Sequence, residues 1–174
     1  FCAVSGQSGS GKSTLLNVIG GLIKPMDGRI IIGDHEVEKP DTGAEENIRK
    51  GSVGFIFQQF HLMPYLTVNE NIILGCHNRH QRDSVNGYLE KFGLTTMKKK
   101  LPEELSTGEK QRVAFIRAIV SRPDILLADE PTGNLDSTTS RDIMALFEAL
   151  NATGHTILVV THELDIARHA RRII

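Results

Sequence analysis

The sequence is poor in cysteine, has no excess of charge of one sign and contains no long apolar run. Its 174 residues include two cysteines, Cys2 and Cys76, far apart in the chain, and we expect both to be reduced, packed side chains. Lysine and arginine number 20 against 21 acidic residues, a net charge of -1. Such a balance gives no broad cationic field, so we predict no nucleic-acid partner.

The sequence also shows no pattern typical of a membrane-spanning helix or a targeting segment. The apolar runs at 30–32 and 125–128 are far shorter than the roughly 20 residues that a spanning helix needs. The first residues, 1–4, lead straight into a glycine-rich loop without a basic segment, which predicts a cytosolic location. Because 1–5 resembles the middle of a buried strand and 171–174 the start of another, both ends are expected to be truncated.

Short apolar segments alternate with helical patterns along the chain. The alternation predicts one α/β domain with a mostly parallel sheet flanked by helices. The expected strands are 1–5, 29–32, 53–57, 124–129 and 156–161, and the expected helices are 12–21, 139–150 and 163–168.

The middle of the chain follows a different pattern. Segments 68–74, 83–92 and 97–100 favour helix, with no convincing strand among them. We therefore predict a core made of 1–57 and 124–174, with a helical subdomain inserted at about 58–123.

A phosphate-binding motif lies between the first strand and the first helix. Residues 6–13, GQSGSGKS, fit the Walker A pattern, whose glycines permit a tight loop of backbone amides around phosphate oxygens. A chance match is on the order of one in a hundred from average glycine usage, which argues against a purely structural turn. The expected phosphate contacts are Gly6, Ser8, Gly9, Ser10, Gly11, Lys12, Ser13 and Thr14. Lys12 would meet the outer phosphates and the Ser13 hydroxyl would bind Mg²⁺.

Two carboxylates follow an apolar strand. Residues 125–128 lead to Asp129 and Glu130, at the edge where a parallel sheet binds its ligand. We predict that Asp129 holds Mg²⁺ and that Glu130 polarises the water that attacks the terminal phosphate. Solvent-facing acids at a strand end would be the preferred interpretation only if the phosphate loop were absent.

Further motifs narrow the class of nucleotide enzyme. Residues 105–113, LSTGEKQRV, resemble the LSGGQ signature of the ABC transporter family. Residues 134–136 are similar to its D-loop, Gln58 to its Q-loop glutamine and His162 to its switch histidine. The motifs occur in the family's order from Ser5 to Arg168, so the chain resembles an ABC ATP-binding domain over essentially its whole length.

The resemblance implies an ATP hydrolase with ATP and Mg²⁺ as cofactors. His162 would contact the terminal phosphate, and Gln58 would touch the metal or the water while sensing a membrane partner. Two domains would pair head to tail as a homodimer, each signature closing on the nucleotide of the other. The residues implied at that contact are Ser106, Gly108, Glu109 and Asp136.

The signature differs from the family's usual sequence at two positions. Thr107 stands where glycine is usual, and its β-branched side chain disfavours positive φ and close approach. We therefore expect a looser clamp or a different turn there. Glu109 stands where glutamine is frequent, and we expect it to favour the start of a helix near that residue.

The amino-acid sequences of 54–71 and 129–136 resemble those of the lipoprotein-releasing and macrolide-export type of the family. Apolar side chains in 60–65 would receive a coupling helix of an integral membrane permease or form a small core under a loop. These side chains are Phe60, Leu62, Met63 and Tyr65. The predicted function is an ATPase that powers a permease at the cytoplasmic face of the inner membrane. The alternatives are an ATP-gated scaffold with little turnover, which Thr107 favours, and a soluble ABC ATPase, which the near-neutral charge disfavours.

Overall fold

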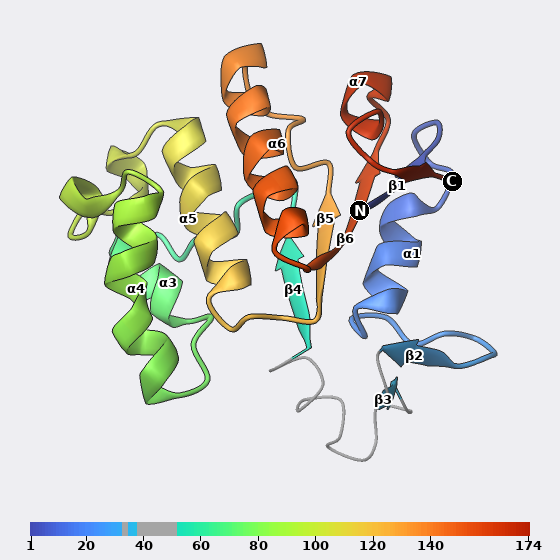
Figure 1. Ribbon diagram of the computed structural model, residues 1–174, viewed down its shortest axis with the longest axis horizontal. Helices are drawn as coiled ribbons and strands as arrows, with labels where there is room; N and C mark the ends of the chain where they lie inside the picture. The colour runs from blue at the N-terminus through green and yellow to red at the C-terminus, as the bar shows by residue number, and fades with distance from the viewer. Residues whose placement is uncertain (33–34, 38–51) are drawn as a thin grey trace.

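A parallel sheet forms the centre of the computed structural model, which describes residues 1–32, 35–37 and 52–174 (Figure 1). Its five strands lie in the order β4-β5-β6-β1-β7, and every neighbouring pair is parallel. The strands are β1 (Cys2–Ser5), β4 (Val53–Ile56), β5 (Ile125–Asp129), β6 (Thr156–Thr161) and β7 (Arg172–Ile173). The predicted α/β fold with a mostly parallel sheet is confirmed.

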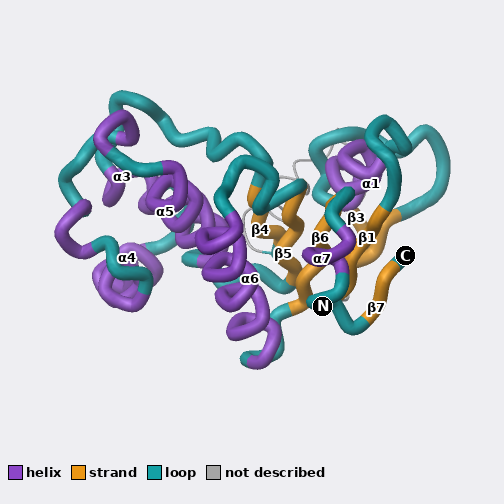
Figure 2. Tube along the Cα trace, turned by 90° about the horizontal axis from the view of Figure 1, so that it is seen from above, coloured by secondary structure: helices purple, strands orange, loops and turns teal. Residues whose placement is uncertain are grey.

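Helices cover both faces of the sheet. On one face, Leu16 of α1 (Lys12–Ile19) packs with Leu127 and Val160. The other face belongs to a larger core that includes Phe147 of α6 (Ser137–Ala152) and Phe115 of α5 (Thr107–Ile119). Figure 2 shows α1 and α6 on opposite sides of the strands. Because both faces are covered, the central strands β5 and β6 are mostly apolar, and their polar residues lie at the strand ends.

The chain between β4 and β5 is helical. It contains α3 (Val68–Ile73), α4 (Arg79–Lys91), two 3-10 turns (Thr95–Met97 and Pro102–Glu104) and α5. Helix α4 begins four residues before the predicted start because the Asn78 side chain accepts a hydrogen bond from the Gln81 amide and caps it there. The segment predicted as a helix at 97–100 is instead a 3-10 turn that ends at Met97.

The strand predicted at 29–32 forms, but in a different sheet. β2 (Ile30–Ile32) pairs antiparallel with β3 (His35–Val37), and both lie outside the five-stranded sheet. The three-residue β3 was not predicted, since so short a segment carries too few positions to show a period of two.

Two helices start earlier than predicted because their caps lie one residue before them. Ser106 caps α5, which begins at Thr107 rather than near Glu109, and Asp136 caps α6, which begins at Ser137 rather than at 139. The strand expected at 171–174 is present as β7. No helix within the described ranges combines the length and apolarity required to span a membrane.

Candidate functional site

The phosphate loop connects β1 to α1 in a conformation that requires glycine. Gly9 and Gly11 have φ values of 81° and 90°, in the left-handed region that side chains disfavour. Lys12 reaches back across the loop, and its Nζ donates to the carbonyl oxygens of Gly6 and Gln7, both at 2.8 Å. The loop is therefore braced by the same ammonium group that is expected to meet the phosphates.

Ser13 and Asp129 meet at the end of β5. The Ser13 hydroxyl donates to Oδ1 of Asp129 at 3.0 Å. Burial raises the pKa of Asp129, the hydrogen bond from Ser13 opposes that effect, and the charge of Glu130 adds to it. A partly buried carboxylate beside a hydroxyl is a hard-oxygen donor set of the kind that Mg²⁺ binds, so these residues fit the predicted metal.

Glu130 is held in a strained conformation by its neighbours. Its φ is 45°, which is unusual for a residue with a side chain, and its amide donates to the Val160 carbonyl at 2.9 Å. Its Oε1 accepts from the His162 amide at 3.0 Å and lies 2.7 Å from Nδ1 of the His162 ring. The other oxygen, Oε2, is buried and has no hydrogen-bond partner among the described residues.

His162 is polarised by this contact. The hydrogen bond to Glu130 is the main cause that raises the pKa of His162, and the charge of Glu130 adds to it. A ring proton on Nδ1 therefore points at Oε1 of Glu130. The pair fixes the orientation of the carboxylate and leaves Oε2 as the acceptor that none of the described residues occupies.

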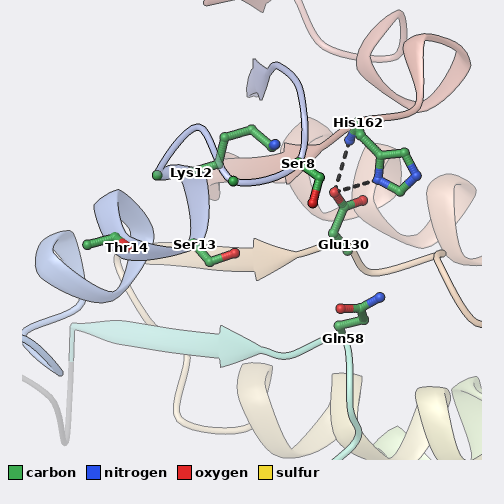
Figure 3. Close-up of a pocket in the computed structure, with 9 residues that line it drawn as sticks. Ser8, Lys12, Ser13, Thr14, Gln58, Glu130 and His162 are labelled. Carbon is green, nitrogen blue, oxygen red and sulfur yellow. Dashed lines mark hydrogen bonds and ion pairs between the residues drawn. The ribbon is translucent and has the colours of Figure 1, made fainter.

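One pocket of about 470 Å³ brings these elements together (Figure 3). Gln58 follows β4 and faces Glu130 from the side opposite His162 in that view. The lining residues are Ser8, Gly9, Gly11, Lys12, Ser13, Thr14, Gln58, Glu130 and His162. Most residues predicted to hold the nucleotide and to act on it therefore lie around the same space.

Four residues predicted to bind the nucleotide lie elsewhere, at the starts of α5 and α6. Ser106 and Glu109 bond reciprocally as the cap of α5, whereas Asp136 accepts from the Thr138 and Thr139 amides, both at 3.0 Å. Gly108 lies against Thr139, so that a methyl group at Gly108 would come within 2.8 Å of the Thr139 Cγ2 atom. The two helix starts are adjacent, and none of the four residues lines the pocket.

Of the two outcomes expected at Thr107, the different turn is wrong, and the looser clamp stays a prediction. Thr107 is the first residue of α5, and it is not among the non-glycine residues that have positive φ in the described chain. The capping box between Ser106 and Glu109 sets a helical backbone there, which any residue tolerates. Thr107 is exposed, so its methyl group extends from the helix start rather than straining it.

Glu109→Ala is expected to lower the free energy of unfolding by about 1 kcal/mol at neutral pH because the capping box is lost. Hydrogen bonds from the Ser106 hydroxyl and amide hold the pKa of Glu109 below its ordinary 4.5. A depressed pKa adds stability above pH 4.5 that is lost as the pH falls through the lowered value.

Urea unfolding of the wild type and the variant between about pH 7 and about pH 3 checks this expectation. Glu109→Gln is the matched control, because its amide oxygen keeps an acceptor but does not titrate in this range. An equal gap between wild type and Glu109→Ala at both ends of the range would contradict the argument.

Two contacts that support the site were not predicted from the sequence. The buried side-chain amide of Gln111 donates to the carbonyl of Pro131, the residue after Glu130, at 2.6 Å. The side-chain amide of Asn134 donates to the Gln58 carbonyl at 2.9 Å. Gln111 lies on an otherwise apolar face of α5, which is the one signal in the sequence that would mark it. Its partner, 20 residues away, cannot be read from spacing.

Comparisons with known proteins match the chain along its length. A family model described as ABC transporter matches residues 1–133. The chain is 44% identical over 179 residues to the ABC transporter ATP-binding protein YvrO of Bacillus subtilis (strain 168), covering 100% of this chain and 78% of that protein. It is 40% identical over 177 residues to the macrolide export ATP-binding/permease protein MacB of Burkholderia pseudomallei (strain 1710b). That match covers 99% of this chain but only 27% of the relative.

Solved structures show the same similarity. The dimeric structure of a post-hydrolysis state of the ATP-binding cassette MJ0796 bound to ADP and Pi has a TM-score of 0.88 at 40% identity, and the match covers 100% of this chain and 79% of that one. A second dimeric structure of MJ0796, described as a bacterial ABC transporter cassette, has the same TM-score at 41% identity.

Proposed function

The chain belongs to the ABC transporter family and is an ABC ATPase, and we propose that it hydrolyses ATP as one half of a pair to power a separate membrane permease. The observation that carries the proposal is the buried Oε2 of Glu130, which has no hydrogen-bond partner within the described part of the chain and lies beside the phosphate loop.

The pocket residues divide the chemistry among themselves. The loop amides and Lys12 would bind the β- and γ-phosphates, while Ser13, Asp129 and Gln58 would hold Mg²⁺. When bound, the metal ion neutralises charge on the phosphate oxygens. Oε2 of Glu130 would accept the proton of the attacking water, because its Oε1 is already occupied by His162.

The second set of residues supports the pairing. Ser106, Gly108, Glu109 and Asp136 lie at two adjacent helix starts, outside the pocket of their own chain. The helix dipole places partial positive charge at a helix start, which attracts anions. We propose that this cluster closes on the ATP of a second copy, and the dimeric cassettes to which the chain is similar support that arrangement.

The permease contact is proposed for the segment after β4. Tyr65 is 74% exposed, whereas Leu62 packs partly against the main core, so the segment combines a small buried base with an exposed aromatic side chain. MacB is named as an ATP-binding/permease protein, and the chain spans 27% of its length. We propose an integral membrane permease as partner and the cytoplasmic face of the inner membrane as location.

The scaffold alternative loses its main argument. It depended on Thr107, and the different turn expected there is absent because Thr107 is the first residue of α5. No other observation favours it over hydrolysis.

Phosphate release from ATP by the purified chain tests the proposed function. We expect steady turnover with Mg²⁺ and a loss of at least about 100-fold when EDTA removes the metal, because the phosphate charge is then left unneutralised. Restoring excess Mg²⁺ should restore the rate. Absence of turnover with Mg²⁺ at every protein concentration, although ATP binds, would contradict hydrolysis and favour the scaffold.

A further inference from the structure

The segment after Gln58 is anchored by a cation from the signature helix. Arg117, on α5, donates from Nη1 to the His61 carbonyl at 2.6 Å and from Nη2 to the Phe60 carbonyl at 2.7 Å. Burial lowers the pKa of Arg117, and no carboxylate pairs with it among the described residues. Burying a guanidinium costs free energy, which its hydrogen bonds to the two carbonyls offset. Removing the side chain would leave both carbonyls without this donor and would destabilise the segment.

The backbone of the segment is shaped to meet this cation. In an extended chain, successive carbonyls point to opposite sides. His61 has a φ of 45°, a left-handed conformation that breaks this alternation, and so two consecutive carbonyls reach the same guanidinium. Such a conformation costs on the order of 1–3 kcal/mol and persists only where the surroundings impose it. The His61 ring also packs edge-on against Phe57, with centroids 5.0 Å apart.

Gln58 lies between this anchor and a second one. The Asn134 amide donates to the Gln58 carbonyl at 2.9 Å, and the Gln58 side chain lines the ATP pocket. A methyl group built on Gly133 would come within 3.3 Å of Gln58 Nε2, so there is little room for the amide on that side. The position of Gln58 therefore depends on two contacts. Asn134 binds its own carbonyl, and Arg117 binds the carbonyls of the residues two and three positions after it.

We propose that Arg117 is a positioning residue that fixes Gln58 in the ATP pocket and ties it to the helix whose start carries Ser106. The inference rests on the proposed function, in which Gln58 holds the Mg²⁺ that hydrolysis requires. Arg117 is not among the residues that line the pocket. Its loss should therefore reduce kcat and spare the binding of ATP, which the phosphate loop supplies.

A double-mutant cycle with Gln58→Ala tests this proposal. We expect Arg117→Met to lower kcat on the order of tenfold or more, as small misplacements of a catalytic group do, with KM for ATP within about twofold of wild type. In the Gln58→Ala background, Arg117→Met should have little further effect on kcat, because both changes remove the same contribution. Arg117→Lys should recover part of the rate, since its ammonium can reach one carbonyl. Arg168→Met, at an exposed ion pair with Asp165, is the control.

The outcomes separate this inference from the proposed function. A wild-type kcat in Arg117→Met, or the same fold loss with and without Gln58, would overturn it. Amide hydrogen exchange of 58–61 in Arg117→Lys, which keeps the charge, tests the anchor without turnover, and exchange faster than in the wild type is expected. If the wild type hydrolyses nothing, the proposed function fails, and unchanged exchange in Arg117→Lys would then overturn the anchor as well.

Discussion

Replacing Glu130 with glutamine is expected to reduce ATP hydrolysis at least about 100-fold while leaving ATP binding intact. Glutamine has the size of glutamate, and its amide oxygen still accepts from the His162 amide. The change removes the proton acceptor at Oε2, which is the one oxygen of this carboxylate without a partner among the described residues. The expected loss therefore falls on the chemical step.

Initial rates of phosphate release at saturating Mg²⁺ and ATP measure this effect, with nucleotide binding followed in parallel. Glu103→Gln, at an exposed turn, is the matched control and should keep the wild-type rate. A Glu130→Gln variant with more than about a tenth of the wild-type rate would show that another group accepts the proton.

Replacing Lys12 with alanine is expected to weaken ATP binding about tenfold to a hundredfold. A hydrogen bond to a charged group contributes about 1.5–3 kcal/mol, and the variant loses such a contact with the phosphates. It also loses the two bonds from Nζ to the Gly6 and Gln7 carbonyls, which brace the loop. Both losses weaken the binding of ATP, whereas the change at Glu130 slows the hydrolysis step that follows binding.

Titration calorimetry with ATP and Mg²⁺ measures the dissociation constant directly. Lys24→Ala removes an equal charge at an exposed position outside the pocket and serves as the control. An unchanged dissociation constant in Lys12→Ala would mean that the loop amides alone bind the phosphates.

Local motifs predicted the pocket because they encode backbone shape over a few residues. Gly9 and Gly11 have left-handed φ angles, which glycine adopts readily. Asp129 and Glu130 come at the end of an apolar run that forms a central strand. The two parts meet because the carboxyl ends of parallel strands share one edge of the sheet. The sequence alone was therefore enough to predict the sheet and most of the pocket.

Two of the contacts between distant residues could not be predicted. The Glu130–His162 pair joins positions 32 apart, and the Arg117–His61 bond joins positions 56 apart. Their geometry depends on φ values of 45° at Glu130 and at His61, which neither residue type favours. The prediction of a different turn at Thr107 failed for a local reason: the helix was expected to begin near Glu109, whereas Ser106 caps it and Thr107 is its first residue.

Sedimentation velocity of the Glu130→Gln variant, with and without ATP and Mg²⁺, tests the paired ATPase most directly. The variant should bind ATP without consuming it, so the closed pair should accumulate. We predict a species of one chain without nucleotide, a species of two chains with Mg²⁺ and ATP, and return to one chain when ADP replaces ATP. A single-chain species at every protein concentration, with ATP demonstrably bound, would contradict the pairing.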